Sequence, residues 1–237
     1  MADIGLILPA AGRGDRLGAS EEKALVPLLG RPMLAWTILA FDAFHEIGER
    51  VVLVPPGREA VFRERVLAPL ALARDVEIRA GGEERQDSVA EGLRALSGKS
   101  RWVLVHDGAR PLVSSALIRR VLDVLRSGEA VVPALPPRES VARAGFEAWV
   151  KCYEDRSKLL LIQTPQGFHV PVLEYAFGKA ASDRFRGTDE ASLVLRANHP
   201  VSWIEGDPEN LKITYPHDLL VAEAILRRRL EAAEVRA

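Results

Sequence analysis

The hydrophobic residues form short continuous runs that alternate with helical stripes. Apolar runs of strand length cover residues 4–8, 51–54, 76–78, 102–105 and 130–135. Between them, apolar side chains recur at helical spacing, at Leu34, Ile38 and Phe41, then Val89, Leu93 and Leu96, and then Leu117, Val121 and Leu125. Continuous apolar strands are typical of a mostly parallel sheet with helices on both faces. The pattern therefore predicts an α/β fold, whose ligands bind at the carboxyl ends of the strands.

The alternation stops at residue 136. Residues 136–159 are charged and show no helical stripe, so they form either a surface excursion or a β-hairpin arm that packs on a partner chain. The regular pattern then resumes, with helices that start near Pro171 and Asp189, a strand at 201–204, and a last helix with one stripe of Leu219, Ala222, Leu226 and Leu230. Because there is no internal repeat, linker or fused second enzyme, we expect a single domain over residues 1–237 with an embedded arm at about 136–159.

Composition narrows the classes of protein to consider. A hydrophobic content of 48% over 237 residues is enough for a substantial core. The formal charge of −1 provides no global field for nucleic acid or anionic membranes, so any anion site is built locally. Cys152 is the one cysteine, which excludes an intramolecular disulfide, and no apolar run approaches the ~18 residues of a membrane span. We therefore expect a cytoplasmic protein that binds neither nucleic acid nor membrane.

The first strand ends in a glycine-rich loop that fits neither of two common phosphate-binding motifs. A P-loop has four residues between its glycines and a lysine after the second, whereas five residues separate Gly12 from Gly18, and Ala19 follows. The dinucleotide fingerprint is matched at Gly12 and Gly14, but Leu17 stands at the place of its third glycine. The second strand also lacks a terminal acidic residue for a ribose, so both motifs are excluded.

Two interpretations of this loop remain open. In the first, backbone N–H groups of Ala10, Ala11 and Gly12 approach a polyphosphate, while Arg16 and Lys23 neutralise its charge. In the second, the loop is a plain strand-to-helix turn with solvated arginines. These residues alone do not decide between the two.

A carboxylate and a second lysine occur further along the chain. Asp107 follows the strand at 102–105 and precedes Arg110, so its carboxylate lies at the sheet edge where ligands bind. At that edge, Asp107 is either a Mg²⁺ ligand beside phosphates or a turn aspartate. Lys212 follows the last strand and a turn, and taken alone it reads as a surface lysine.

Six segments together are similar to one enzyme family. "LPAAGRGDRLG", "GGEERQDSV", "VHDGARP", "TPQGF", "TDEAS" and "EGDPENLKIT" have the order and spacing of the 2-C-methyl-D-erythritol 4-phosphate cytidylyltransferases, over residues 4–230. The resemblance implies a Rossmann-like fold with a protruding arm that forms a homodimer. It also implies CTP and a polyol phosphate as substrates, with Mg²⁺ or another divalent cation as cofactor.

The implied reaction needs positive charge more than it needs a base. A phosphomonoester has a second pKa of about 6, so the attacking group is already ionised at neutral pH. The obstacle is to bring this dianion to a triphosphate and to stabilise the charge of the transition state. Arginine, lysine and a divalent cation suit that task.

The resemblance assigns roles residue by residue. Arg16 and Lys23 match the triphosphate-binding pair, and Lys212 a second lysine at the reacting phosphates. The segment that reads cytosine is matched by Gly82, Glu83 and Ser88. On the substrate side, with Asp107 also near the metal, the matching residues are Asp107, Arg110, Ser140, Arg156, Thr164 and Thr188. Because the arm exchanges between subunits in this family, Arg156 is expected to serve the active site of the partner.

The main departure from the family pattern surrounds Lys23. The segment reads "SEEKAL", where proline usually precedes the lysine and glutamine follows it. In addition, Gly108 and Ala80 replace a usual alanine and a frequent aspartate. The opening loop is therefore the first place to look for disorder or an unusual conformation.

Two other functions remain to be tested. The nucleotide half would look much the same in a cytidylyltransferase for another polyol phosphate, such as ribitol 5-phosphate. A catalytically silent homologue that binds nucleotide as a regulator is disfavoured, because Arg16, Lys23, Asp107 and Lys212 are all retained.

Overall fold

The computed structural model describes residues 2–12, 14–18 and 21–234. Its central sheet contains β1 (Ile4–Pro9), β4 (Ile47–Val54), β5 (Glu77–Ala80), β6 (Trp102–Val105), β7 (Ala130–Leu135), β10 (Leu161–Ile162), β11 (Gln166–His169) and β12 (Ser202–Glu205). The α-helices of this described part are α1 (Met33–Asp42), α2 (Glu59–Phe62), α3 (Arg85–Ala95), α4 (Ser115–Leu125), α5 (Val170–Ser182), α6 (Glu190–Arg196) and α7 (Pro216–Glu234).

The sheet is mostly parallel, as predicted. Its strands follow the order β10-β7-β11-β6-β1-β4-β5, and β12 pairs in addition with β7. Strands β10 and β11 are antiparallel to their neighbours, whereas the other pairs are parallel. Neither antiparallel strand was predicted, because "QGFH" at 166–169 has neither a continuous nor an alternating apolar pattern.

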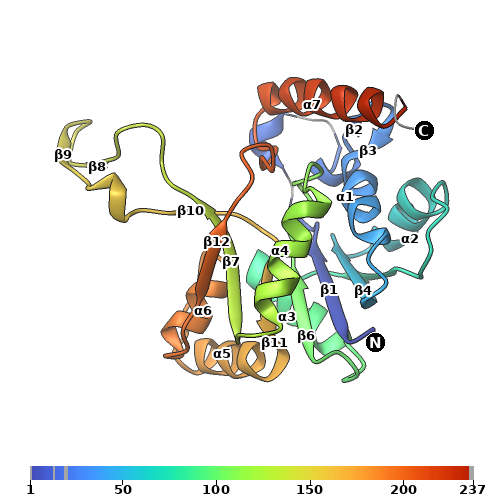
Figure 1. Ribbon diagram of the computed structural model, residues 1–237, viewed down its shortest axis with the longest axis horizontal. Coiled ribbons are helices and arrows are strands. Elements are labelled where there is room, and N and C mark those ends of the chain that lie inside the picture. The colour runs from blue at the N-terminus through green and yellow to red at the C-terminus, as the bar shows by residue number, and fades with distance from the viewer. Residues whose placement is uncertain (1, 13, 19–20, 235–237) are drawn as a thin grey trace.

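Helices cover both faces of this sheet (Figure 1). Alternate residues of β1 pack against the two opposite helical layers. Leu6 and Leu8 lie in the apolar cluster that includes α1 and α4, whereas Ile7 lies in the cluster that includes α3, α5 and α6. All three side chains are buried. Burial on both faces explains why the strand is apolar at every position rather than at every second one. The α/β fold class is therefore confirmed.

The segment after β7 forms a hairpin that projects from the body (Figure 1). Strands β8 (Ala142–Ala144) and β9 (Val150–Tyr153) pair with each other, outside the central sheet. The hairpin carries exposed apolar side chains, among them Phe146, Trp149 and Tyr153, which are 84%, 75% and 74% exposed. Of the two forms expected for this segment, the structure has the β-hairpin.

Among the described residues, no helix combines the length and the apolar character needed to cross a bilayer.

Two short 3₁₀ turns, η1 (Asp15–Leu17) and η2 (Lys23–Leu25), make up much of the described opening loop. Residues 13, 19 and 20 of that loop lie outside the described residues. A small hairpin of β2 (Pro27–Leu28) and β3 (Arg31–Pro32) then leads into α1.

Candidate active site

A pocket opens where the carboxyl ends of β1 and β6 lie side by side. These strands are hydrogen-bonded neighbours, with Ile7 opposite Val105, so the loops that leave them share one edge of the sheet. The start of α3 forms another wall, and two lysines from distant segments complete the lining. The residues predicted for the site that line this pocket are Ala10, Ala11, Gly12, Lys23, Gly82, Glu83, Ser88, Asp107 and Lys212.

Small residues shape the wall next to α3. A Cβ on Gly81 would lie 2.7 Å from Ser88 Oγ, and one on Gly82 would lie 2.3 Å from the Asp87 Cβ. Glycine is therefore required here for the loop to approach the helix. Ser88 Oγ accepts a hydrogen bond from the Gly82 N–H at 3.1 Å and donates to the Glu84 carbonyl at 3.1 Å. The hydroxyl hydrogen is therefore in use within the protein, which leaves Ser88 an acceptor toward the pocket.

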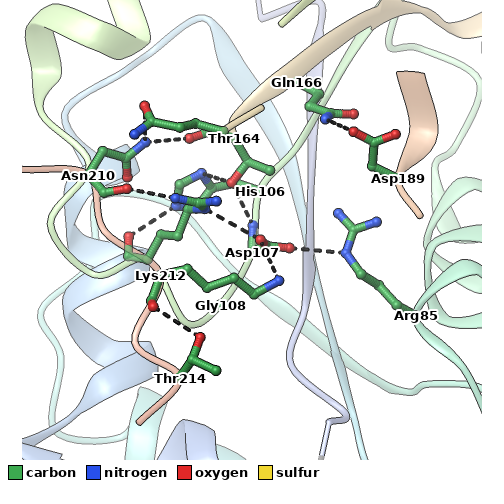
Figure 2. A network of polar contacts seen from close by, with 12 residues as sticks. Arg85, His106, Asp107, Gly108, Thr164, Gln166, Asp189, Asn210, Lys212 and Thr214 are labelled. Carbon is green, nitrogen blue, oxygen red and sulfur yellow. Dashed lines mark hydrogen bonds and ion pairs between the residues drawn. The ribbon is translucent and has the colours of Figure 1, made fainter. Parts of the chain in front are cut away.

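Asp107 is the centre of the charged network (Figure 2). Its Oδ1 accepts from Arg85 Nε at 3.0 Å, and its Oδ2 lies 3.0 Å from Lys212 Nζ and 3.4 Å from Arg110 Nε. Burial alone would raise the pKa of Asp107, but Arg85, Lys212 and Arg110 outweigh it and lower the pKa far below its usual range. Asp107 is therefore a permanently ionised carboxylate that forms ion pairs with Arg85, Arg110 and Lys212.

Lys23 and Lys212 place two ammonium groups at one pocket. Burial, followed by repulsion from Lys212, lowers the pKa of Lys23 to about 8. Asp107 raises that pKa, so the carboxylate offsets only part of the effect. An anion that bridged the two lysines would remove their repulsion, and the pocket is therefore prepared for a strongly negative ligand.

Arg16 lies on η1, outside the residues that line the pocket. Its side chain is exposed, and the guanidinium lies 5.9 Å from the centre of the Tyr215 ring. This cation–π contact directs Arg16 toward the segment that follows Lys212. Arg16 also contributes to the lowered pKa of Lys23 by charge repulsion, so the two cations act in one field.

A buried group behind Asp107 holds its backbone in place. Thr164 Oγ1 accepts the Asp107 N–H at 3.1 Å and lies 2.9 Å from His106 Nδ1, while His106 Nε2 lies 3.1 Å from the Arg110 carbonyl. Burial lowers the pKa of His106 to about 4, so the ring is neutral at pH 7. Arg110 donates to the Asn210 carbonyl at 2.7 Å. Thr164 and Arg110, two of the predicted substrate-side residues, support Asp107 from behind and do not line the pocket.

The other predicted substrate-side residues lie elsewhere on this chain. Ser140 and Arg156 belong to the projecting arm, where Arg156 is exposed and donates to the Arg138 carbonyl at 2.6 Å. Thr188 is exposed just before α6. The described pocket lining contains none of these three residues. Their roles stay predictions.

Sequence reasoning missed one ion-pair network. Arg85, at the start of α3, bridges Asp107 and Glu190, with its Nη1 2.7 Å from Glu190 Oε1. Although burial disfavours the charged guanidinium, these two carboxylates raise the pKa of Arg85 well above its usual value. Glu190 is 1% exposed, and its Oε2 has no hydrogen-bond partner among the described residues. Both residues fall inside the quoted segments "GGEERQDSV" and "TDEAS", but nothing in those letters indicates that they pair.

The protein donors suit a divalent cation that arrives with phosphates. Within residues 2–12, 14–18 and 21–234 there is no group of three or more His, Cys, Asp or Glu side chains able to hold a metal ion. Asp107 is the pocket aspartate, and three cations already surround its oxygens. Mg²⁺ commonly uses one or two carboxylates together with substrate phosphates and water. Asp107 fits that arrangement, whereas a metal held by the protein alone does not fit.

Known proteins of similar sequence and structure carry one description. Residues 4–228 match the family model IspD, 2-C-methyl-D-erythritol 4-phosphate cytidylyltransferase. The chain is 39% identical to the enzyme of that description from Synechococcus elongatus, with 97% of this chain and 99% of the relative covered. It is 37% identical to the one from Syntrophus aciditrophicus, with 94% and 95% covered.

Two solved structures agree with this result. The 2-C-methyl-D-erythritol 4-phosphate cytidylyltransferase of Thermus thermophilus superposes with a TM-score of 0.79 at 36% identity, over 95% of this chain and 99% of that chain. The 4-diphosphocytidyl-2C-methyl-D-erythritol synthase of Anaerococcus prevotii gives a TM-score of 0.82 at 27% identity, over 94% and 96%. The mostly parallel sheet and the cation-lined pocket are consistent with these relatives. Because the family model covers nearly the whole chain and the relatives match it along their length, the chain belongs to the 2-C-methyl-D-erythritol 4-phosphate cytidylyltransferase family.

Proposed function

We propose that this chain uses the pair Lys23 and Lys212 to transfer the cytidylyl group of CTP to 2-C-methyl-D-erythritol 4-phosphate, in non-mevalonate isoprenoid biosynthesis. The observation that carries the proposal is the convergence of these two ammonium groups with Asp107 on one pocket at the carboxyl ends of β1 and β6. The products are 4-diphosphocytidyl-2-C-methyl-D-erythritol and pyrophosphate.

The reaction is an in-line displacement at phosphorus. An oxygen of the substrate phosphate attacks the α-phosphorus of CTP, and the bond from that phosphorus to the bridging oxygen of pyrophosphate breaks. The electron pair of the broken bond leaves with pyrophosphate. No proton has to be removed from the nucleophile, because the phosphomonoester is already largely ionised at neutral pH. Lys23 and Lys212 stabilise the negative charge on the non-bridging oxygens, and Arg16 binds the leaving phosphates from the rim.

Different residues bind the nucleotide base and the metal. Ala10, Ala11 and Gly12 bring backbone groups to the nucleotide, and Gly82, Glu83 and Ser88 read cytosine, with Ser88 as an acceptor for its amino group. A divalent cation such as Mg²⁺ supplies charge neutralisation at the phosphates. Asp107 is the residue that would hold it. Lys212, which is partly exposed, would then turn from Asp107 toward the phosphates.

The alkaline limb of the rate profile should report Lys23. Because the pKa of Lys23 is about 8 in the free enzyme, kcat/KM for CTP is expected to fall as the pH rises through about 8 and this lysine loses its charge. At lower pH, down to the second phosphate pKa of about 6, the activity should hold. Lys23→Arg should move the fall to higher pH, because a guanidinium stays charged. Initial rates at low CTP across neutral and alkaline pH measure this effect, and an unmoved limb in the arginine variant would assign it to another group.

We also propose a homodimer, in which the arm of one subunit completes the site of the other. The exposed Phe146, Trp149 and Tyr153 suit a surface covered by a second copy, and Arg156 and Ser140 lie on the same arm. Thr188 of the receiving subunit is exposed just before α6, and we assign it to the substrate side of that site. The solvent-exposed Cys152 of this arm suits the reducing cytoplasm, where we place the enzyme.

Mixed dimers test the exchange of arms. Lys23→Ala and Arg156→Ala are each expected to be poorly active alone, but their mixed dimer contains one site with an intact Lys23 and an intact Arg156. Co-expression of the two variants, with purification of the mixture, should therefore restore up to about a quarter of normal activity, since half of randomly formed dimers are mixed. If both single variants are poorly active and the confirmed mixed dimer recovers no activity, Arg156 acts in its own subunit. Normal activity of Arg156→Ala alone would show that Arg156 has no role in the reaction.

Pyrophosphate release tests the proposed activity. Incubation with CTP, Mg²⁺ and 2-C-methyl-D-erythritol 4-phosphate is expected to release pyrophosphate and to form the cytidine diphosphate product, and a chelator is expected to stop both. Tight CTP binding without release, with any polyol phosphate, would instead indicate a regulator that binds nucleotide. Ribitol 5-phosphate is the comparison substrate for the other alternative.

A further inference from the structure

The segment that leads into Lys23 is tied to a neighbouring helix by two ion pairs. Arg58, just before α2, contacts Glu22 with two nitrogens, Nε to Oε1 at 2.5 Å and Nη2 to Oε2 at 3.2 Å. Arg65 Nη1 lies 2.8 Å from Glu21 Oε2. The two acids are consecutive in the sequence, and Glu22 directly precedes Lys23, so the two ion pairs restrain the backbone that leads into this lysine.

The two arginines of these ion pairs belong to a segment that is fixed in the hydrophobic core. Arg58 directly precedes α2, and Arg65 lies within the π-helical turn η3 (Arg63–Leu67) that follows it. These two elements insert Phe62 and Val66 into the core, where both are fully buried. The guanidinium of Arg58 lowers the pKa of Glu22, as expected for a charged partner in two-pronged contact. The acids of the loop are thus held by a platform that is itself fixed in the core.

Glu22 also sets the start of the 3₁₀ turn that contains Lys23. Its carbonyl accepts the Leu25 N–H at 2.8 Å, which closes η2. On the opposite side, a Cβ on Gly14 would lie only 2.5 Å from the Lys23 Cβ, so the preceding loop packs closely against this lysine. The position of Lys23 therefore depends on where Glu22 is held.

We propose that Glu22 and Arg58, assisted by Glu21 and Arg65, are positioning residues that hold Lys23 at the nucleotide phosphates. We call these four residues the loop clamp. The proposal rests on the proposed role of Lys23. It also accounts for the lack of a proline before this lysine, because the ion pairs supply a restraint that the ring of a proline would otherwise supply.

The backbone conformation at Glu22 allows the ion pair to be replaced by a proline ring as the restraint on this loop. Its φ of −55° lies in the range that the proline ring fixes. Glu22→Pro is therefore expected to keep the conformation while it removes the ion pair with Arg58. Glu22→Gln removes the charge and leaves φ free.

The expected effect falls on CTP affinity. Partly exposed ion pairs are individually weak, so loss of one is expected to raise KM for CTP about threefold, and loss of both about tenfold. The apparent affinity falls with the fraction of enzyme whose Lys23 is in place. At saturating CTP the bound triphosphate itself holds Lys23, so kcat should change little. KM for the polyol phosphate should also stay the same.

The variants are Glu22→Gln, Arg58→Gln, the double variant Glu21→Gln with Glu22→Gln, and Glu22→Pro. Glu64→Gln, an exposed charge change on η3, is the matched control. Steady-state rates and hydrogen exchange at the amides of Lys23 to Val26 are measured for each protein at low and high salt. We expect faster exchange and a higher KM for CTP in the glutamine variants, and values near those of the unmodified chain in Glu22→Pro. That variant should also show a weaker rise of KM with salt.

Two results would overturn the proposal, and they are distinguishable. If Glu22→Gln and Arg58→Gln leave KM for CTP unchanged, the loop clamp does not position Lys23, whatever the exchange rates do. If Lys23→Ala retains normal turnover, the role of Lys23 fails and the proposal fails with it. In that case the exchange rates at residues 23–26 would still report whether the ion pairs order the loop.

Discussion

Replacement of Lys23 with alanine is expected to lower kcat/KM by about 10²–10³, the usual cost of removing a group that stabilises charge in a transition state. The stability of the protein should hardly change. Burial and repulsion from Lys212 disfavour the charged form of Lys23, so the alanine variant loses little favourable interaction and no longer has this repulsion. Pyrophosphate release under saturating and limiting CTP measures the first quantity, and urea unfolding measures the second.

Lys99→Ala provides the control for this experiment. Lys99 is exposed beyond the carboxyl end of α3, so its removal should affect neither rate nor stability. Lys23→Arg should retain part of the activity, because it keeps the charge but not the shape of an ammonium group. Normal turnover in Lys23→Ala would remove this lysine from the mechanism.

Arg85→Gln is expected to lower the free energy of unfolding by about 3 kcal/mol. The rate of cytidylyl transfer should fall as well. The variant leaves Glu190, which is 1% exposed, without its cation and removes one of the three cations around Asp107. Because Arg85 is itself about a quarter exposed, water reaches the gap, so we expect the lower end of the usual range for a broken buried pair. Urea unfolding at neutral pH measures the loss.

Two further variants separate this effect from a general weakening of α3. The double variant Arg85→Gln with Glu190→Gln should recover part of the stability, because it removes the buried charge that the single variant leaves unpaired. Arg94→Gln, on the exposed side of the same helix, should change stability by no more than about 0.5 kcal/mol. A loss below about 1 kcal/mol in Arg85→Gln would contradict a stabilising role for this ion pair.

The fold was predictable where apolar residues are continuous. Strand β1 and strand β6 could be located because burial on both faces requires apolar residues throughout, and their order along the chain placed Asp107 at the ligand edge. The convergence of Lys23 and Lys212 followed from the family resemblance rather than from spacing. Strand β11 could not be predicted, since its four residues pair with two strands although only Phe168 is strongly apolar.

Polar networks were the least predictable part. Arg85 and Glu190 are 105 residues apart, and each alone reads as a surface charge on a helix. The same limit applies to the opening loop, which looked under-restrained because it lacks a proline. The restraint comes from Arg58 and Arg65, and only the folded chain brings these arginines to Glu22 and Glu21.

We expect the pocket of one subunit and the arm of its partner to select 2-C-methyl-D-erythritol 4-phosphate for cytidylyl transfer from CTP. The most direct measurement is kcat/KM for this substrate and for ribitol 5-phosphate, with both present in one solution and the two cytidine diphosphate products separated. We predict a preference for the methylerythritol phosphate of about a hundredfold, the scale on which a pocket discriminates by shape. Equal use of the two substrates, or a preference for ribitol 5-phosphate, would contradict the account.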